Sequence, residues 1–421
     1  MTIAVYADWE GLPQPTQLGW LHAQRTARTE TLQFEFVPTA LADPLLNKVP
    51  LDPRLGWFSG LQHPPQGHSV FGLFADASPD RWGRVLMQRR LERQQRAGTE
   101  PRNTRLYESD YLLGVHDLYR VGALRFRRDD AGNFLDDRHD MAAPPFVQLR
   151  KLEAASRALE NDEDNRAKQG DEWLRMLIAP GGSLGGARPK ASVVDKAGKL
   201  WIAKFPSVKD EHDVGAWESI VQTMAAKCGL RTAPVLAKRF VGKQHTFLIR
   251  RFDRSEQGKR LHFASAMTLT GRKDGDDAGS GASYLELAQV LIRHGAQTAS
   301  DLPELWLRIV FNMLVSNDDD HLRNHGFILV PGKGWRLSEV YDLNPVPDAA
   351  GLRLNVSEAD NALDLELARS VAPLFRVKTK RANELIQHCR AMVAQWRTLA
   401  TSLGVTKREQ EWMAPAFRLA E

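Results

Sequence analysis

The strongest constraint on the fold is a change in the sequence pattern along the chain. Between residues 181 and 252, short apolar strands alternate with turns and with one helical segment, at about 214–228. Beyond about residue 285, helical patterns dominate, apart from strand-like segments at 326–330 and 335–340. A strand-rich part followed by a helix-rich part is typical of an α+β protein. We therefore expect a β-rich lobe followed by a helical lobe.

The first part of the chain has its own pattern. Alternating apolar residues at 3–6 and 32–36, separated by Gly and Pro, predict strands of hairpins. Ser78 as N-cap, with Pro79 and Asp80 in the first turn, predicts a helix that runs to about residue 96. This part is therefore expected to be an α+β domain.

Two sequence features mark the expected boundaries. An Asp-rich stretch at 129–140 followed by Pro144-Pro145 predicts a surface turn and a boundary near 145. We expect an amino-terminal domain over 1–145, a strand-rich lobe over 146–260 and a helical lobe over 261–421.

Composition excludes several classes of protein. The chain has 57 Lys and Arg against 52 Asp and Glu, a net charge of +5, which neither demands nor excludes a polyanionic partner. Its two cysteines, Cys228 and Cys389, exclude a disulfide scaffold and a cysteine-rich zinc site, and they suit a reducing compartment. No apolar stretch approaches the roughly 18 residues that cross a membrane. We expect a cytoplasmic protein with no membrane partner.

A local concentration of arginine lies in the predicted helix and just after it. Residues 81–105 contain eight Arg and two Glu. This pattern is typical of a solvated helix face, and it also fits a surface that contacts nucleic acid or an acidic partner.

The most informative segment is Ser316-Asn-Asp-Asp-Asp-His-Leu-Arg-Asn324, which follows an apolar helix predicted over about 303–315. Asp319 and Asn324 have the spacing of a kinase catalytic loop, in which the Asp receives the hydroxyl proton and the Asn binds Mg²⁺. We expect His321 to position this loop, and Asp318 and Asp320 to face solvent or basic residues.

A second acidic residue follows in the right order. Asp342 lies 18 residues beyond Asn324, after a short apolar strand, where a kinase keeps its metal-binding Asp. One carboxylate and one amide oxygen, completed by water and phosphate, suit magnesium.

A predicted strand earlier in the chain, at about 200–205, contains a lysine that fits the same kinase pattern. Lys204 in Ile-Ala-Lys-Phe-Pro is placed like the kinase lysine that contacts ATP phosphates, and Glu218 in the next helix is placed to pair with it. Before this strand, Gly181-Gly-Ser-Leu-Gly-Gly-Ala-Arg-Pro-Lys190 has backbone N–H groups suited to phosphate, although it matches neither the Walker pattern nor the kinase glycine pattern.

Taken together, these residues resemble the HipA family of bacterial serine/threonine kinases, the toxins of type II toxin–antitoxin pairs. The resemblance rests on the segments 183–190, 202–206, 251–254, 317–324 and 341–342, and on 69–96 in the amino-terminal part. It implies a two-lobed protein-kinase-like fold, α+β in class, with an α+β amino-terminal domain.

The resemblance also implies residue roles. Asp319 is the implied catalytic base, assisted by Lys204 and His321, and Asn324 and Asp342 are the implied ligands of Mg²⁺. ATP is implied to lie between the lobes. The residues implied to bind it are Ser183, Leu184, Gly185, Gly186, Ala187, Lys204, Glu218, Phe252 and Asp253. Ser183 is also the implied site of an autophosphorylation that switches the kinase off.

The family partners are a helix-turn-helix antitoxin, HipB-like, and through it operator DNA. The implied protein substrate is an aminoacyl-tRNA synthetase. The motifs also fit a small-molecule phosphotransferase, and a non-catalytic ATP-binding co-repressor scaffold is a third reading, although such a scaffold needs none of Lys204, Asp319, Asn324 and Asp342.

Overall fold

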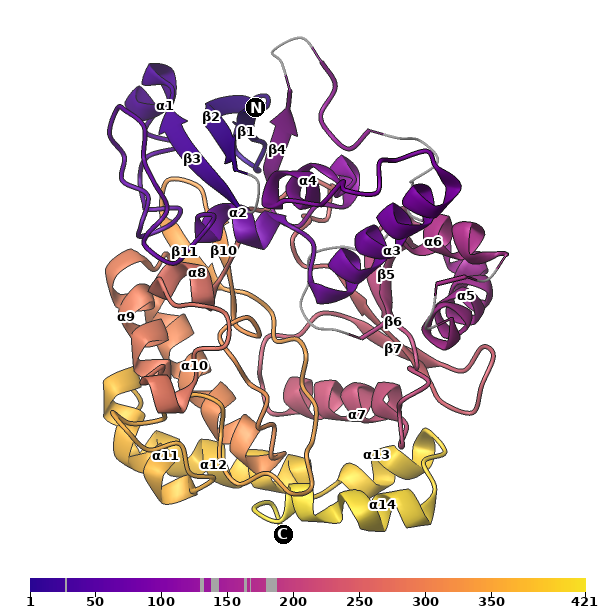
Figure 1. Ribbon diagram of the computed structural model, residues 1–421. Helices are drawn as coiled ribbons and strands as arrows, with labels where there is room; N and C mark the ends of the chain where they lie inside the picture. Colours follow the sequence, from indigo (N-terminus) through magenta and orange to yellow (C-terminus); the bar gives the residue numbers. More distant parts are fainter. Residues whose placement is uncertain (27–28, 129–131, 138–143, 163–164, 167, 179–187) are drawn as a thin grey trace. The chain divides into compact units, whose positions relative to one another are not determined.

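The computed structural model describes residues 1–26, 29–128, 132–137, 144–162, 165–166, 168–178 and 188–421 (Figure 1). The chain divides into two compact units. Unit 1 comprises residues 1–209, 240–242 and 248–264, and unit 2 comprises residues 210–239, 243–247 and 265–421. The predicted division into three domains, with boundaries at 145 and 260, remains a prediction.

Unit 1 contains two groups of strands and the helices beside them. Its elements are β1 (Thr2–Ala7), β2 (Thr16–Arg25), β3 (Glu30–Phe36), α1 (Pro38–Ala42), α2 (Gly72–Ala77), α3 (Arg81–Ala97), α4 (Glu108–Leu113), η1 (Asp117–Tyr119), β4 (Leu124–Arg127), η3 (Phe146–Gln148), α5 (Leu149–Asn161), α6 (Gly170–Ile178), β5 (Lys190–Val194) and β6 (Leu200–Lys204). Two strands, β8 (Thr246–Arg250) and β9 (Phe263–Ser265), begin or end at the unit boundary.

Unit 2 is mainly helical, as the sequence predicts. Its elements are α7 (Val214–Lys227), β7 (Val235–Lys238), α8 (Ala266–Thr270), η4 (Ala278–Ser280), α9 (Tyr284–His294), α10 (Thr298–Leu314), β10 (Gly326–Val330), β11 (Gly334–Leu337), α11 (Leu365–Val371), η5 (Ala372–Phe375), α12 (Thr379–Val393), α13 (Trp396–Ser402), α14 (Lys407–Met413) and η6 (Ala414–Phe417).

The amino-terminal sheet has the strand order β3-β2-β1-β4 and is antiparallel throughout. The strands predicted at 3–6 and 32–36 are confirmed as β1 and β3. The strand β2, which pairs with both, is not evident from alternation because Gly19 interrupts it. A Cβ at Gly19 would lie 2.0 Å from the Glu35 carbonyl oxygen, so only glycine allows the two strands to approach here.

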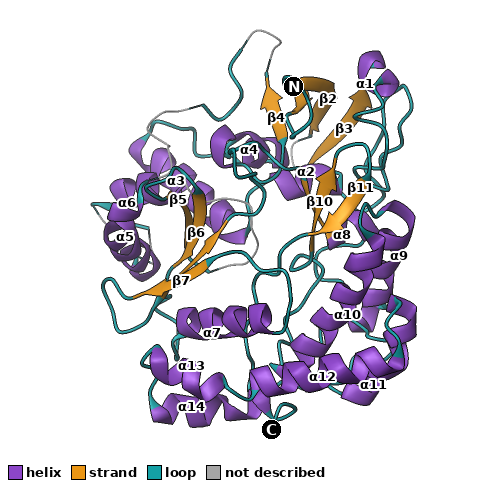
Figure 2. Cartoon of the chain, turned by 180° about the vertical axis from the view of Figure 1, so that it is seen from behind, coloured by secondary structure: helices purple, strands orange, loops and turns teal. Residues whose placement is uncertain are grey.

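The second group of strands in unit 1 carries a helical layer. Strands β5, β6 and β8 lie side by side in that order, and α3, α5 and α6 pack on one face of β5 and β6 (Figure 2). The core between them includes Trp82, Leu152, Val193, Phe205 and Leu248. Burial of this apolar surface fixes the helices on the sheet.

The N-cap of α3 differs from the prediction. Asp80, not Ser78, caps the helix, because the Asp80 Oδ1 accepts a hydrogen bond from the Gly83 N–H at 2.8 Å. Ser78 instead ends the preceding helix, where its Oγ donates to the Phe74 carbonyl at 2.9 Å.

The arginines of α3 are largely used inside unit 1. Arg84 pairs with Glu108 at 2.7 Å, and Arg93 pairs with Asp162 at 2.8 Å. Arg89 donates to the Leu159 carbonyl at the end of α5. These side chains therefore hold neighbouring segments together, a role that neither interpretation of the basic stretch included.

Unit 2 is organised around aromatic residues of α7 and the carboxyl-terminal helices. The rings of Trp217 and Trp396 lie 5.9 Å apart, and Phe417 stacks on Trp396 at 4.6 Å. The two cysteines, separated by 161 positions, meet here: each Sγ lies 4.0 Å from the other's carbonyl oxygen. Within the described part of the chain, no helix combines the length and the apolar character that a membrane span requires.

A buried ion pair links two distant segments of unit 1. Lys190 Nζ, at the start of β5, lies 3.1 Å from Asp80 Oδ2, and both side chains are at most 4% exposed. Because Asp80 also caps α3, its carboxylate ties the helix to the strand that follows the glycine-rich segment.

We predict that Asp80→Asn lowers the free energy of unfolding by about 3–5 kcal/mol, because asparagine still caps the helix but removes the negative charge that lies 3.1 Å from the buried Lys190 ammonium. Urea unfolding measures the change. The double variant Asp80→Asn with Lys190→Met removes both charges and should recover part of the loss. Equal stability of Asp80→Asn and the wild type would contradict the role of the pair.

Candidate active site

The catalytic segment predicted from the sequence forms a tight loop in unit 2. The apolar helix α10 ends at Leu314, and Ser316 adopts a positive φ of 50° that turns the chain away from the helix axis. The His321 N–H then donates to the Asp319 carbonyl at 2.8 Å, and the Asn324 N–H donates to the His321 carbonyl at 2.8 Å. These successive turns gather three predicted site residues into one loop before β10 begins.

Asp320 anchors this loop. Its Oδ2 accepts hydrogen bonds from Tyr284 Oη at 2.5 Å, Asn312 Nδ2 at 2.6 Å and His325 Nε2 at 2.8 Å. The residue is only 2% exposed, so of the two expected surroundings, solvent or basic residues, solvent is wrong and His325 is a basic residue in contact. Three donors satisfy the charge in the interior, and they come from α9, from α10 and from the residue before β10.

Asp319 is an exposed residue that lies beside other charges. Desolvation of its carboxyl group by neighbouring parts of the chain raises its pKa above the ordinary value, His321 opposes this rise, and the negative charge of Asp342 adds to it. The same interaction shows that Asp319 and Asp342 lie within electrostatic range of each other. A carboxylate whose pKa is shifted toward neutrality is better suited to accept a proton from a hydroxyl group.

Asn324 presents an oxygen that the protein does not use. Its Nδ2 donates to the Asp319 carbonyl at 2.9 Å, which fixes the amide plane. Its Oδ1 is buried and has no hydrogen-bond partner among the described residues. A buried acceptor left open is costly unless a ligand fills it. This oxygen therefore fits a metal-ligand role.

Asp342 is held in an unusual backbone conformation. Its φ is +58°, in the left-handed region that residues other than glycine rarely adopt. The preceding Tyr341 is fixed by a 2.7 Å hydrogen bond from its Oη to the Arg323 carbonyl, one residue before Asn324. Strain of this kind concentrates at functional sites.

The oxygen donors of Asn324 and Asp342 are of the type that magnesium prefers. Within the described ranges, no group of three or more His, Cys, Asp or Glu side chains is arranged to hold a metal ion. One carboxylate and one amide would leave the remaining positions to water and phosphate.

Unit 1 contains three further predicted site residues, Lys204, Phe252 and Asp253. Lys204 ends β6, where it lies opposite Lys190 in the strand register. Phe252 and Asp253 follow β8. Asp253 is buried, and although burial favours its neutral form, Arg251 and Arg254 hold its pKa well below the usual range. Its Oδ2 also accepts the Gly122 N–H at 3.0 Å, so the carboxylate is occupied by protein groups.

The remaining predicted residues stay predictions. Glu218 is buried in α7 of unit 2 and Lys204 belongs to unit 1, so their pairing is untested. Ser183, Leu184, Gly185, Gly186 and Ala187 lie outside the described residues.

Sequence reasoning missed the supporting residues of the loop. Tyr284 and Asn312 lie 36 and 8 positions from Asp320, and neither belongs to a motif. The only available signal was Asn312, a polar residue in the apolar stretch of α10.

The loop and the strained aspartate have the arrangement expected of a kinase-type catalytic segment. The family model described as "HipA-like C-terminal domain" matches residues 182–396, just over half of the chain. The chain therefore belongs to the HipA-like family, which confirms the resemblance inferred from its motifs.

Two curated relatives match part of the chain. One, from Haemophilus influenzae and named "Putative kinase", is 32% identical over 25% of this chain and 33% of its own length. The other, from Sinorhizobium fredii and named "Putative kinase Y4mE", is 28% identical over 41% of this chain and 43% of its own length. The chain thus aligns with less than half the length of either relative.

A solved structure matches nearly the whole chain. It contains HipA of Shewanella oneidensis MR-1 with HipB and operator DNA, and it is 16% identical, with a TM-score of 0.66, over 96% of this chain and 95% of that chain. This similarity confirms the predicted α+β, kinase-like fold.

We predict that Asp320→Asn reduces phosphate transfer at least about tenfold and lowers the free energy of unfolding by about 2–3 kcal/mol, because a neutral amide oxygen accepts the three hydrogen bonds more weakly than a carboxylate does. Rates of labelled-phosphate incorporation and thermal unfolding measure the two effects. Asp318→Asn, two positions earlier, is the matched control and should change little. Full activity in Asp320→Asn would show that the loop does not need this anchor.

Proposed function

We propose that this protein is an ATP- and Mg²⁺-dependent serine/threonine protein kinase. The observation that carries the proposal is the gathering of Asp319, Asn324 and Asp342 in unit 2, with an open buried oxygen on Asn324 and a strained backbone at Asp342. Membership of the HipA-like family supports the same activity.

In the proposed reaction, each residue has a defined task. Asp319 accepts the proton of the attacking hydroxyl group, and the shift of its pKa toward neutrality assists that step. The Asn324 Oδ1 and the Asp342 carboxylate would hold magnesium, which neutralises charge on the phosphates. Lys204 contributes a further positive charge to the phosphates, as its place in β6 suggests.

The proposed cellular partners follow from the family. We propose a helix-turn-helix antitoxin as binding partner and, through it, operator DNA; the similar Shewanella structure contains HipB and operator DNA. An aminoacyl-tRNA synthetase is the first protein substrate to test, and the cytoplasm is the proposed compartment.

Asp319→Asn should reduce phosphate transfer by about 10²–10⁴-fold, because the amide cannot accept the proton. Purified protein is incubated with γ-labelled ATP and Mg²⁺, and incorporated label is counted. In the wild type, transfer should fall as the pH drops through the raised pKa of Asp319, above the pH at which an ordinary aspartate protonates. Asp318→Asn serves as the control. Unchanged transfer in Asp319→Asn would refute the assignment of the base.

We also expect phosphate on Ser183 after incubation with ATP and Mg²⁺. Peptide mapping of wild type and Asp319→Asn should show a modified Ser183 only in the wild type. Because a phosphoserine carries about −1.5 to −2 charges, the modified loop should no longer hold ATP phosphates, and transfer should stop. Ser183→Ala should keep transfer for longer; a Ser183→Ala rate that decays as the wild type does would contradict self-inactivation.

A further inference from the structure

Unit 1 contains a cavity of about 280 Å³ that is not part of the catalytic segment. It is bounded by the turn between β5 and β6, by the residues that follow β8, and by η1. Its charged lining residues are Lys199, Arg250, Arg251, Arg254, Glu256 and Arg260. Five cations therefore face one carboxylate.

The cavity lies at the far end of β6 from Lys204. Leu200 lines it and pairs with Val194, whereas Lys204 pairs with Lys190. Four residues of strand span about 13 Å, so a ligand here is separate from one at Lys204.

Two cations at the outer part of the cavity, Lys199 and Arg250, form ion pairs only with an exposed carboxylate. Glu256 is 65% exposed, and it pairs with Lys199 at 3.2 Å and with Arg250 at 2.8 Å. Exposed ion pairs of this kind contribute little stability, so an incoming anion can replace the Glu256 carboxylate.

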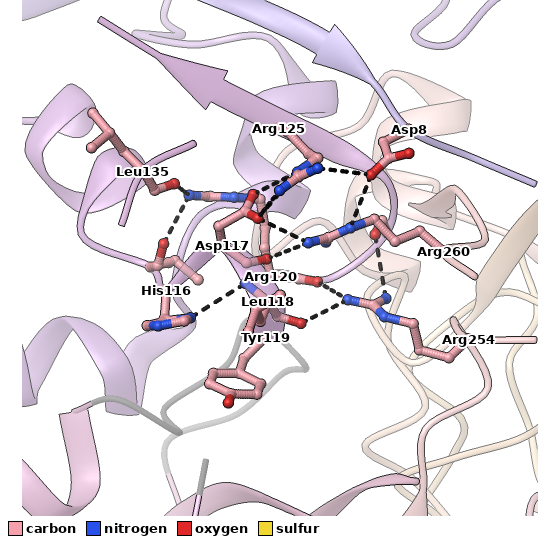
Figure 3. Close-up of polar contacts among 12 residues, drawn as sticks. Asp8, His116, Asp117, Leu118, Tyr119, Arg120, Arg125, Leu135, Arg254 and Arg260 are labelled. Atoms are coloured by element: carbon pink, nitrogen blue, oxygen red, sulfur yellow. Dashed lines mark hydrogen bonds and ion pairs between the residues drawn. The ribbon is translucent and has the colours of Figure 1, made fainter. Parts of the chain in front are cut away.

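The inner wall is a buried network in which arginines outnumber carboxylates (Figure 3). Arg260 pairs with Asp117 at 3.2 Å, and Arg254 donates to the Leu118 and Arg120 carbonyls. Burial lowers the pKa of Arg254 to about 9; among the neighbouring charges, Asp253 opposes this shift, and Arg251 and Arg260 add to it.

One donor of that wall is left open. The Arg260 Nη1 is buried and has no hydrogen-bond partner among the described residues, while its Nη2 is bound to Asp117. An unused guanidinium donor in a cationic cavity calls for an acceptor oxygen.

We propose that this cavity binds a phosphate-bearing small molecule, whose oxyanion is held by Arg260, Arg250 and Lys199. Guanidinium groups match the geometry of phosphate oxygens. The apolar lining from Leu118, Tyr119 and Leu200 offers a surface for a sugar or base, and the volume suits a ligand of that size. The proposal does not depend on the kinase reaction.

Isothermal titration of the full-length protein tests the proposal with three probes: inorganic phosphate, glucose 6-phosphate and adenosine monophosphate. Adenosine and glucose are the uncharged controls. Lys199→Gln and Arg250→Gln should each weaken binding about tenfold, since each removes one charge-assisted contact. Lys196→Gln, in the same turn but outside the cavity lining, is the matched control and should bind as the wild type does.

Lys204→Met separates this site from the proposed ATP site, and should leave binding of inorganic phosphate and of glucose 6-phosphate unchanged. Adenosine monophosphate can also bind at the proposed ATP site, so only the binding that Lys199→Gln and Arg250→Gln weaken is assigned to the cavity. The tightest of the probes so assigned identifies the ligand type: free phosphate, sugar phosphate or nucleotide. Absence of saturable binding for all three would overturn the proposal. So would loss of inorganic phosphate and glucose 6-phosphate binding in Lys204→Met, or equal binding in wild type, Lys199→Gln and Arg250→Gln.

Discussion

The candidate active site depends on one buried carboxylate that does no chemistry. Asp320 lies between Asp319 and His321, and its Oδ2 receives hydrogen bonds from α9, from α10 and from His325. A buried charge with three donors has one low-energy position, since any shift breaks bonds that water cannot replace. The chain must therefore turn at this point. This turn fixes the positions of Asp319 and Asn324 in the loop.

Unit 1 uses buried charge in a similar way. Asp253 joins Arg251, Arg254 and the Gly122 N–H, so the segment after β8 is fixed to a loop more than 130 positions earlier. Asp80 fixes α3 to β5 in the same manner. In both cases a sequence motif that resembles a functional signature contains an aspartate whose observed contacts are structural.

The sequence predicts the order of the elements and the catalytic loop well, because both depend on local patterns. Periodicity identifies α10, and the spacing of Asp319, Asn324 and Asp342 leads to the candidate site. Residues that act through distant partners escape this reasoning. The contact between Cys228 and Cys389 and the pair of Asp80 with Lys190 depend on tertiary packing, which no local pattern encodes. The burial of Asp320 was not predicted for the same reason. A run of three aspartates predicts a segment in solvent, and the side chains that donate hydrogen bonds to Asp320 are not evident from the local sequence.

A buried polar atom without a hydrogen-bond partner indicates a ligand site only when the charges around it are also considered. The indole nitrogens of Trp9 and Trp82 are buried and have no hydrogen-bond partner in the described part of the chain, as is also true of Asn324 Oδ1 and Arg260 Nη1. Trp82 lies in an apolar core, where the ring gains enough from burial to offset one lost hydrogen bond. Asn324 is instead hydrogen-bonded to the backbone of the acidic residue Asp319, and Arg260 lies in the wall of a cationic cavity. A buried oxygen without a hydrogen-bond partner that lies among acidic groups favours binding of a cation. A buried N–H donor without a partner that lies among arginines favours binding of an anion. The charges around the atom therefore distinguish a ligand site from a polar atom that is unpaired only because of packing.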